Sequence, residues 1–301
     1  MKSEVVTSAS NPKFKNLLAL QEKSRERRGQ GLFVVEGRRE LEHCLEGGYK
    51  VRTVFVCPEL YGSSIHAENL DQLCHTEGLN HSCHTEDLNH SCHTEGLNPS
   101  CHTEGLKGPS VSQIIEIPEQ LYRKAAYRES TEGIIAEVEY KALGLSDLKL
   151  PENPLIVVLE SVEKPGNLGA VLRSADAAGA SAVLICDPLT DIYNPNLIRA
   201  SIGAVFTVPT VACGSSEAIS FLKERGIQIL TAQLQDSSLY YDVDMARGTA
   251  IVMGTESTGL SNQWRAAADA HIRIPMLGRL DSLNVSVSAA ILLYEAVRQR
   301  Q

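Results

Sequence analysis

The sequence of 301 residues contains no long hydrophobic run. None of its apolar stretches approaches the roughly 20 residues that a membrane-spanning helix needs. The first residues, Met1–Val6, turn polar again within a few positions and lack the hydrophobic stretch of a signal peptide. Because hydrophobic residues make up 43% and charged residues 22% of the chain, the composition is that of a globular protein. We therefore expect a cytoplasmic protein without a membrane partner.

An excess of positive charge is also missing, since the formal net charge is −9. This balance speaks against a protein that holds nucleic acid through bulk electrostatics. Residues 1–60 nevertheless carry eleven Lys and Arg against eight Glu. We expect any nucleic-acid contacts to lie in this segment. Alternatively, its basic residues form an ordinary solvated helix face. The candidate contacts are Arg25, Arg27, Arg28 and Arg38.

Two familiar site patterns are absent. No Gly-rich dinucleotide fingerprint and no phosphate-binding P-loop occurs, so a nucleotide site cannot be inferred from glycine spacing. Cysteine and histidine do not follow the paired spacing of structural zinc sites, and we predict no metal centre. Four of the eight cysteines stand in or beside hydrophobic runs, where small buried thiols are expected, and they do not require an oxidising compartment. These four are Cys44, Cys57, Cys186 and Cys213.

A nine-residue repeat contains the other four cysteines. Its units begin at Cys74, Cys83, Cys92 and Cys101, and each reads Cys-His-Thr-Glu-(Gly/Asp)-Leu. Near-identity of the units indicates a duplicated insertion rather than a set of selected ligands. We predict a flexible surface loop over residues 74–106, with adventitious metal binding as the alternative.

Without this insertion, the first part of the chain has the pattern of a small α/β domain. Strands are predicted at 31–37, 51–56, 111–117 and 133–139, with helices at 38–47 and about 118–127. The segment 143–154 contains two prolines and little apolar periodicity, which is typical of a linker. We therefore expect an N-terminal domain over residues 1–142, a linker over 143–154 and a second domain over 155–301.

The second half alternates apolar strands with helices. Strands are predicted at 155–159, 182–186, 206–211, 227–232, 250–254 and 271–274, and helices near 168–178, 195–204, 215–225, 262–269 and 284–299. Continuous apolar strands that alternate with helices indicate a mainly parallel sheet covered on both faces. Ligands bind such sheets beyond the carboxyl ends of the strands, so we expect the residues of a site in the loops at those ends.

Three of these loops carry suggestive residues. After strand 155–159, Asn167 is predicted to cap a helix that ends before Gly179, with Arg173 one turn beyond Gly169. After strand 250–254, a glycine-flanked turn bears the carboxylate of Glu256. After strand 271–274, the chain breaks at a proline and enters a long helix through Ser282 and Asn284. Taken singly, each loop is explained by ordinary capping and turn formation.

Taken together, the three loops form a joint pattern. This pattern resembles the three motifs of the SpoU (TrmH) methyltransferases, which belong to the SPOUT superfamily. The matching residues are Asn167-x-Gly169-x-x-x-Arg173, Gly254-x-Glu256-x-x-Gly259-Leu260, and Ile274-Pro275-Met276 with Ser282-Leu283-Asn284-Val285-Ser286. The resemblance covers residues 154–300 strongly and extends weakly to residues 8–60, which are similar to the ribosomal-protein-like RNA-binding domain of the family.

The resemblance implies a fold and an activity. The fold is an α/β protein whose C-terminal domain forms a deep trefoil knot with a mainly parallel sheet, and the protein is expected to be a homodimer. The activity is methyl transfer from S-adenosyl-L-methionine to a ribose 2′-hydroxyl of structured RNA, with rRNA favoured over tRNA. Cofactor contacts fall to Gly254, Ile274, Met276 and Leu283, and the residues around the reacting hydroxyl are Asn167, Arg173, Glu256, Ser282 and Asn284.

Arg173 needs a role that suits its chemistry. A guanidinium is a poor base, because its pKa is about 12.5 or more. We therefore assign Arg173 to stabilising a developing alkoxide or to holding the adjacent phosphate, with Glu256 and Asn284 positioning it. The proton leaves through water or a phosphate, and the sequence leaves both routes open.

Two positions depart from the family pattern. Lys164 replaces a common Asp, and Thr255 replaces a common Asn. Neither substitution removes a residue assigned to catalysis, although Lys164 changes the local charge where RNA approaches.

Two rival functions come from other classes of protein. A catalytically silent RNA-binding protein of the same fold is disfavoured, because the motif residues are intact. A nucleotide-dependent oxidoreductase is disfavoured because strand 155–159 is not followed by a glycine-rich fingerprint.

Overall fold

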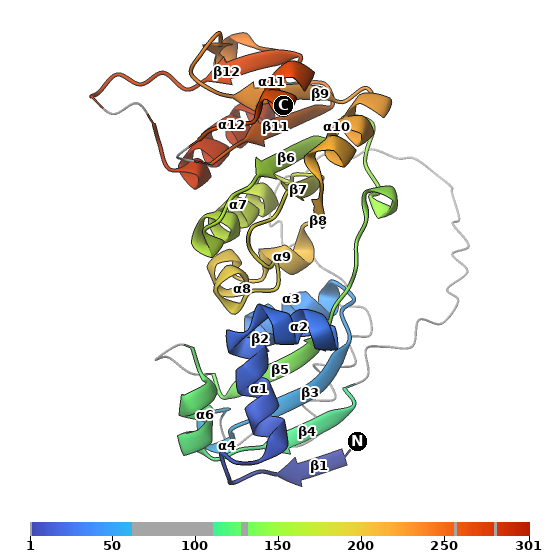
Figure 1. Ribbon diagram of the computed structural model, residues 1–301, viewed down its shortest axis with the longest axis vertical. Helices are drawn as coiled ribbons and strands as arrows, with labels where there is room; N and C mark the ends of the chain where they lie inside the picture. Colours follow the sequence, from blue (N-terminus) through green and yellow to red (C-terminus); the bar gives the residue numbers. More distant parts are fainter. Residues whose placement is uncertain (1, 62–110, 128–131, 256–257, 280–281) are drawn as a thin grey trace, which may run out of the picture.

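The computed structural model describes residues 2–61, 111–127, 132–255, 258–279 and 282–301. Figure 1 shows an elongated molecule with two sheets, the N-terminal one in the lower part of the view and the C-terminal one in the upper part. The Cys-His repeat at 74–106 and the predicted catalytic residue Glu256 lie outside the described residues. No helix in the described ranges is long and apolar enough to cross a membrane.

The N-terminal sheet has five strands in the order β1-β4-β3-β5-β2. They are β1 (Lys2–Val5), β2 (Leu32–Glu36), β3 (Val51–Val56), β4 (Gln113–Glu116) and β5 (Ile134–Glu139). Strand β5 runs antiparallel to both of its neighbours, and the other pairs are parallel. The four strands predicted in this half are confirmed, whereas β1 was not predicted because its four residues are too short to show a period.

The helices of this half are α1 (Pro12–Glu22), α2 (Ser24–Gln30), α3 (Arg38–Glu46), α4 (Pro58–Tyr61) and α6 (Glu119–Ala125). Helix α1 begins with a good start signal: the Asn11 side chain accepts a hydrogen bond from Lys13 N at 2.8 Å, and Pro12 occupies the first helical position. Its apolar side chains pack with those of α6 on one face of the sheet. The opposite face receives α3 and a segment from the second half of the chain.

The C-terminal sheet has seven strands in the order β10-β12-β9-β11-β6-β7-β8. All six neighbouring pairs are parallel, which confirms the predicted parallel sheet. The strands are β6 (Leu155–Glu160), β7 (Ala182–Cys186), β8 (Thr210–Cys213), β9 (Gln228–Ala232), β10 (Ser238–Leu239), β11 (Thr249–Met253) and β12 (Ala270–Arg273).

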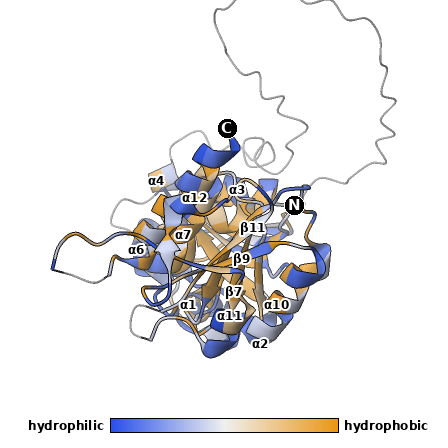
Figure 2. Cartoon of the chain, turned by 90° about the horizontal axis from the view of Figure 1, so that it is seen from above, coloured by the Kyte–Doolittle hydropathy of each residue, from blue (hydrophilic) through white to orange (hydrophobic). Residues whose placement is uncertain are grey.

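Helices cover both faces of this sheet because strand side chains alternate between the faces. Val157 points to one core with α7 (Pro165–Ala177) and α12 (Val285–Arg300), while Ile156 and Val158 point to the other with α10 (Ser215–Glu224) and α11 (Asn262–Ala267). Seen from above, the apolar strands lie in the centre with polar residues outside them (Figure 2). The remaining helices are α8 (Pro195–Ser201), α9 (Ala204–Thr207), and the short 3-10 turns η1 (Leu145–Asp147) and η2 (Tyr240–Asp242).

One predicted strand is partly wrong. Residues 206–211 were expected to be extended, but Phe206 belongs to α9, and β8 begins only at Thr210. The reason is a pair of left-handed residues, Ile202 and Gly203, which end α8 and start a second short helix. An apolar run gives no sign of such a reversal, because its hydrophobic content suits a buried helix and a strand equally.

The two halves share a continuous core. Arg27 of α2 donates from Nε to Asp191 Oδ2 at 2.7 Å, and the two side chains are only 2% and 9% exposed. Phe33 of β2 stacks on Tyr193 with ring centroids 4.3 Å apart. Burial raises the pKa of Tyr49, Tyr140 and Tyr193, so these phenols stay neutral within the cluster.

Candidate active site

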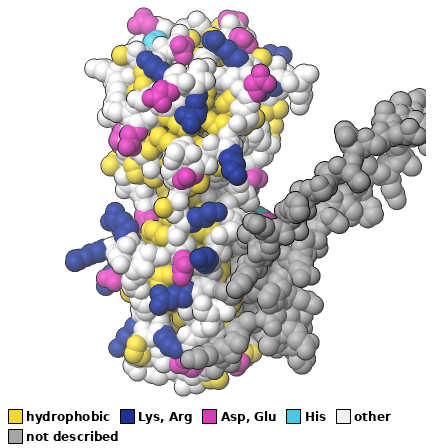
Figure 3. All heavy atoms as spheres, turned by 90° about the vertical axis from the view of Figure 1, so that its right-hand side faces the viewer, with side chains coloured by type: hydrophobic (Ala, Val, Ile, Leu, Met, Phe, Trp, Pro, Cys, Tyr) yellow, Lys and Arg dark blue, Asp and Glu magenta, His cyan; other side chains and the backbone are white. Residues whose placement is uncertain are grey.

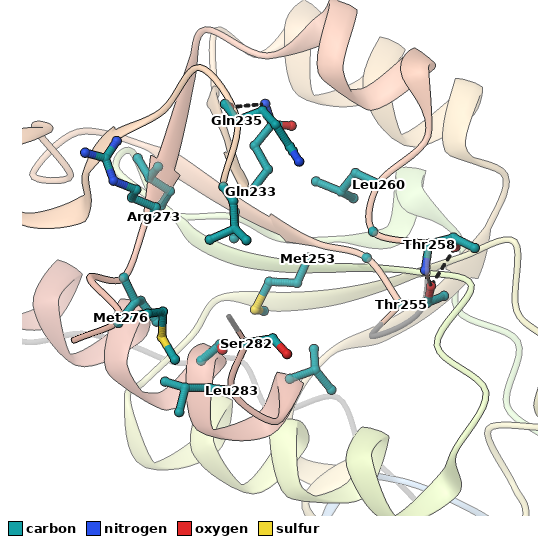
Figure 4. Close-up of a pocket in the computed structure, with 18 of the residues that line it drawn as sticks. Gln233, Gln235, Met253, Thr255, Thr258, Leu260, Arg273, Met276, Ser282 and Leu283 are labelled. Carbon is teal, nitrogen blue, oxygen red and sulfur yellow. Dashed lines mark hydrogen bonds between the residues drawn. The ribbon is translucent and has the colours of Figure 1, made fainter. Parts of the chain in front are cut away.

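A pocket of about 380 Å³ opens where the carboxyl ends of β9, β11 and β12 meet. Figure 4 shows Met253 at the end of β11 pointing into the space between Gln233 on one side and Ser282 and Leu283 on the other. The volume lies within the range of about 300–1,000 Å³ that small-molecule sites have. Its position agrees with the general rule for ligands of parallel sheets.

The pocket combines an apolar lining with a few polar groups. Apolar side chains come from Met253, Leu260, Ile272, Ile274, Met276 and Leu283, and polar ones from Gln233, Thr255, Thr258, Ser282 and Ser288. Gly254, Ile274, Met276 and Leu283, the four residues assigned to the cofactor by resemblance, all line it, and so does Ser282.

A second hollow of about 220 Å³ adjoins the first. Gly254, Thr255 and Val285 line both of them. The second hollow adds Val162, Glu163, Lys164 and Asn167 from the loop and first turn after β6. The geometry therefore provides a larger pocket for one ligand and a neighbouring hollow for a second.

Asn284 and Asn167 connect two of the predicted motifs. Asn284 caps α12 by accepting a hydrogen bond from Ser286 N at 2.9 Å. Its Nδ2 donates to Asn167 Oδ1 at 3.2 Å. The predicted capping role of Asn167 is wrong, because α7 begins at Pro165 and Asn167 is its third residue. The side chain of Asn167 is instead turned to α12.

Gly254 is required because the loop that follows it folds back against it. A Cβ atom at this position would collide with the carbonyl of Gly259, which has a left-handed φ of 67°. Thr255 secures the same turn: its Oγ1 accepts from Thr258 N at 3.0 Å, and its carbonyl accepts from Gly259 N at 3.0 Å. Thr255, at a position where the family commonly has Asn, thus has a structural role in shaping the pocket wall.

Gly169 allows α7 and α8 to approach closely. A Cβ atom on Gly169 would lie 2.5 Å from Ala200 Cβ and 2.7 Å from Ser201 N. The glycine of the first motif therefore fixes the packing of α8 against the helix that carries Asn167.

Arg173 lines neither of the two hollows. It is exposed on α7, and its side chain makes no hydrogen bond or ion pair with the rest of the described chain. Its guanidinium is therefore available to a substrate. An exposed arginine without a catalytic role would have the same surroundings.

The candidate nucleic-acid contacts divide into two groups. Arg25, Arg28 and Arg38 are exposed. Arg27 is only 2% exposed, and besides its ion pair it donates to the carbonyls of Leu20 and Gln21. Its prediction as an RNA contact is wrong, because sequence cannot distinguish a buried arginine within a basic run. Figure 3 shows Lys and Arg side chains spread over both the upper and the lower part of one face, interspersed with Asp and Glu.

The large pocket also contains buried polar atoms that form no hydrogen bond with the described chain. They are Gln233 Oε1 and Arg265 Nε. An adenosine with a methionine tail presents both donors and acceptors together with apolar surface, so the residues present fit S-adenosyl-L-methionine. The loop after β9 that bears Gln233 was missed in the sequence. The strand-end rule points to this loop only once β9 is known to lie directly beside β11.

Comparison with known protein families gives two matches. The model of the SpoU rRNA methylase family matches residues 154–294. The model of the MRM3-like substrate binding domain matches residues 11–79.

Individual relatives agree with these matches. The 23S rRNA (uridine(2479)-2′-O)-methyltransferase of Streptomyces viridochromogenes is 35% identical over 195 residues, which are 62% of this chain and 68% of the relative. The 23S rRNA (guanosine-2′-O-)-methyltransferase RlmB of Bordetella pertussis is 39% identical over 175 residues, 56% of this chain and 71% of the relative.

A solved structure extends the likeness over both halves of the chain. The AdoMet-bound rRNA methyltransferase from Sinorhizobium meliloti superposes with a TM-score of 0.79 at 26% identity and covers 98% of each chain. The family model and both relatives agree, and the chain belongs to the SpoU rRNA methylase family.

Proposed function

We propose that this protein transfers a methyl group from S-adenosyl-L-methionine to a ribose 2′-hydroxyl of ribosomal RNA. The observation that carries the proposal is the pair of adjoining hollows: a pocket of about 380 Å³ formed by the second and third motifs, and a hollow of about 220 Å³ that Asn167 lines. Both relatives named above act on 23S rRNA at a 2′-oxygen, which favours rRNA over tRNA.

When bound, S-adenosyl-L-methionine supplies the electrophilic methyl group. Gly254, Ile274, Met276 and Leu283 would hold it in the larger pocket, with Gln233 and Arg265 offering an acceptor and a donor. Gly254 also borders the smaller hollow, so a ribose held there would lie directly beside the methyl donor.

The residues of the chain must then position the ribose oxygen and stabilise its developing charge. Asn167 lines the smaller hollow and accepts a hydrogen bond from Asn284, and both carry amide groups that can orient a hydroxyl. Ser282 lies at the border of the pocket next to them. Arg173 would contribute a positive charge to the oxygen or the adjacent phosphate, and Glu256, by resemblance, would help to position Arg173.

In this proposal the two halves of the chain have different functions. Residues 1–142 would bind the RNA substrate, residues 143–154 would link the halves, and residues 155–301 would catalyse the transfer. The match of the substrate-binding family model to residues 11–79 supports the first assignment, and exposed Arg25, Arg28 and Arg38 would supply phosphate contacts. Since rRNA is the substrate, we place the protein in the cytoplasm.

We also propose a homodimer and a trefoil knot, as in the family. Val287 and Tyr294 lie seven residues apart on α12 and are 47% and 51% exposed, so they give this helix an apolar outer face beside α7. A partner placed there would approach Arg173 as well. Residues 254–255 and 258–260 border the same pocket as Ile274, Met276, Ser282 and Leu283, as the two threaded segments of the knot would.

Mapping of cellular RNA tests the substrate. Ribosomal RNA from a strain that lacks the gene should lose one 2′-O-methylated nucleotide, detected by nuclease digestion and mass analysis, and the wild-type gene should restore it. Unchanged ribosomal RNA together with a missing methyl group in tRNA would overturn the choice of substrate.

A further inference from the structure

A tyrosine and an arginine meet on the surface between the two halves of the chain. The Arg199 guanidinium of α8 lies 5.1 Å from the centroid of the Tyr127 ring, which follows α6. Tyr127 is 48% exposed although its ring is large and apolar. An exposed ring and a neighbouring cation are the groups that stack on unpaired bases and attract their phosphates.

The tyrosine is fixed in place rather than loose. Its backbone N donates to Glu36 Oε2 at 2.8 Å, and its hydroxyl accepts from Asn196 Nδ2 at 3.4 Å. Asn196 Oδ1 in turn accepts from Arg199 Nη2 at 3.3 Å. A rigid aromatic side chain loses little conformational entropy when a base stacks on it.

The charge of Arg199 is not neutralised by the described chain. In the described ranges, the one hydrogen bond of its guanidinium goes to the neutral amide of Asn196, and no carboxylate forms an ion pair with it. The guanidinium of Arg173 likewise has neither a hydrogen bond nor an ion pair in the described ranges. A second pair of the same kind lies nearby in the sequence. The Arg38 guanidinium, two residues after Glu36, lies 4.5 Å from the centroid of the Tyr61 ring.

The pair is linked through α8 to the proposed active site. Ala200, next to Arg199, is the residue against which Gly169 packs, and Gly169 lies two residues from Asn167. Figure 1 shows the loop before α12, then α7, then α8 and finally the end of α6 one below another on the left side of the molecule. A single strand leaving the active site along this side would meet Arg199 and Tyr127 next.

We propose that Tyr127 and Arg199 form a stacking site for an unpaired base of the RNA substrate, next to the nucleotide that is methylated. This inference rests on the proposed function. The Tyr127 ring stacks on the base, and Arg199 contacts the phosphate beside it. Every base has a flat face, so the site selects single-stranded or looped RNA over duplex without reading the sequence.

Binding of two labelled probes by the full-length protein tests this site. The first is a 12-nucleotide oligoadenylate, and the second is an abasic ribose-phosphate oligomer of the same length and charge. Fluorescence anisotropy at low salt gives the affinity of each. The wild type should bind oligoadenylate more tightly than the abasic oligomer.

The variants separate stacking from charge. Tyr127→Ala should weaken oligoadenylate binding about 10-fold, the scale of one lost stacking contact, and leave abasic binding unchanged. Tyr127→Phe should bind like the wild type. Arg199→Ala should weaken both probes, whereas Arg225→Ala, which removes a guanidinium 4.0 Å from Phe221 on α10, should weaken neither.

Equal oligoadenylate binding by Tyr127→Ala and the wild type would overturn the proposal, and so would an equal loss on both probes. If Tyr127→Ala lowers the melting temperature, Tyr127→Leu decides the question, because it keeps the apolar bulk and removes the flat aromatic face. It should weaken oligoadenylate selectively, and unchanged selectivity would contradict the site. A wild type that stacks RNA but transfers no methyl group would overturn the proposed function alone.

Discussion

Asn284 Nδ2 donates to Asn167 Oδ1 at 3.2 Å, across 117 residues of sequence. The bond joins the start of α12 to the first turn of α7, and it lies at the edge of the hollow that Asn167 lines. Asn284 serves two purposes at once, because the same side chain caps α12 through its Oδ1.

Two substitutions at Asn284 separate these purposes. Asn284→Ser keeps a capping oxygen but loses the amide donor, so turnover should fall about 10- to 100-fold, as expected for a misplaced group in the active site, with little change in stability. Asn284→Ala should show the same fall and also lose about 1 kcal/mol of unfolding free energy. Steady-state methylation and urea unfolding measure both quantities. Wild-type turnover in Asn284→Ser would remove the catalytic role.

Gly169 should tolerate no side chain. In Gly169→Ala the new Cβ would lie 2.5 Å from Ala200 Cβ, and we expect a loss of about 1–3 kcal/mol of unfolding free energy from overpacking. Gly166→Ala in the same helix meets no atom within 4 Å and should change stability by at most about 1 kcal/mol. Equal stability of the two variants in urea unfolding would show that α7 and α8 can separate at little cost.

Glu137 should make stability depend on pH. Burial in β5 raises the pKa of its carboxyl, and Asn16 Nδ2 donates to it at 3.1 Å. A raised folded-state pKa means that the favourable contribution is present at low pH and is lost as the pH rises through that pKa. Glu137→Gln removes the buried charge, so it should melt above the wild type at pH 8, with the difference shrinking towards pH 4.

Glu139→Gln is the matched control, because Glu139 is exposed on the same strand. It should give the same melting difference at both pH values. A constant difference for Glu137→Gln as well would show that the buried carboxyl does not govern the pH dependence.

Arg173 should matter for turnover and not for cofactor binding. Arg173→Ala removes the proposed charge, and we expect about 10²-fold slower turnover on ribosomal RNA. The affinity for S-adenosyl-L-methionine, measured by calorimetry, should stay unchanged because Arg173 lines neither hollow. Arg173→Lys keeps the charge but loses the planar group. It should restore part of the turnover if Arg173 acts through charge alone, and none if it makes a planar two-point contact. Wild-type rates in both variants would make Arg173 an ordinary exposed residue.

The regular elements of the fold could be predicted from the sequence. Buried parallel strands give continuous apolar runs, so β7 was predicted with its bounds and β6, β9, β11 and β12 to within one or two residues. The strand order could not be predicted, because β11 lies between β9 and β6 through contacts between distant residues.

The site was predictable where its chemistry is local and unpredictable where it depends on packing. The turn residue Gly254 and the cap Asn284 have local signals and lie at the pocket or beside it. The burial of Arg27 depends on Asp191, 164 residues away, and no local signal reveals it. Gln233 follows an ordinary strand, and its importance appears only when β9 is placed beside β11.

Transfer of a labelled methyl group is the most direct test of the central claim. The purified protein, S-adenosyl-L-methionine labelled in its methyl group, and a transcript of 23S rRNA should yield labelled RNA. Nuclease digestion should then release the label as a single 2′-O-methylated nucleoside, while an equal amount of Asn284→Ser should yield far less. Label on a base, or no label in any ribosomal RNA although the cofactor binds, would contradict the account.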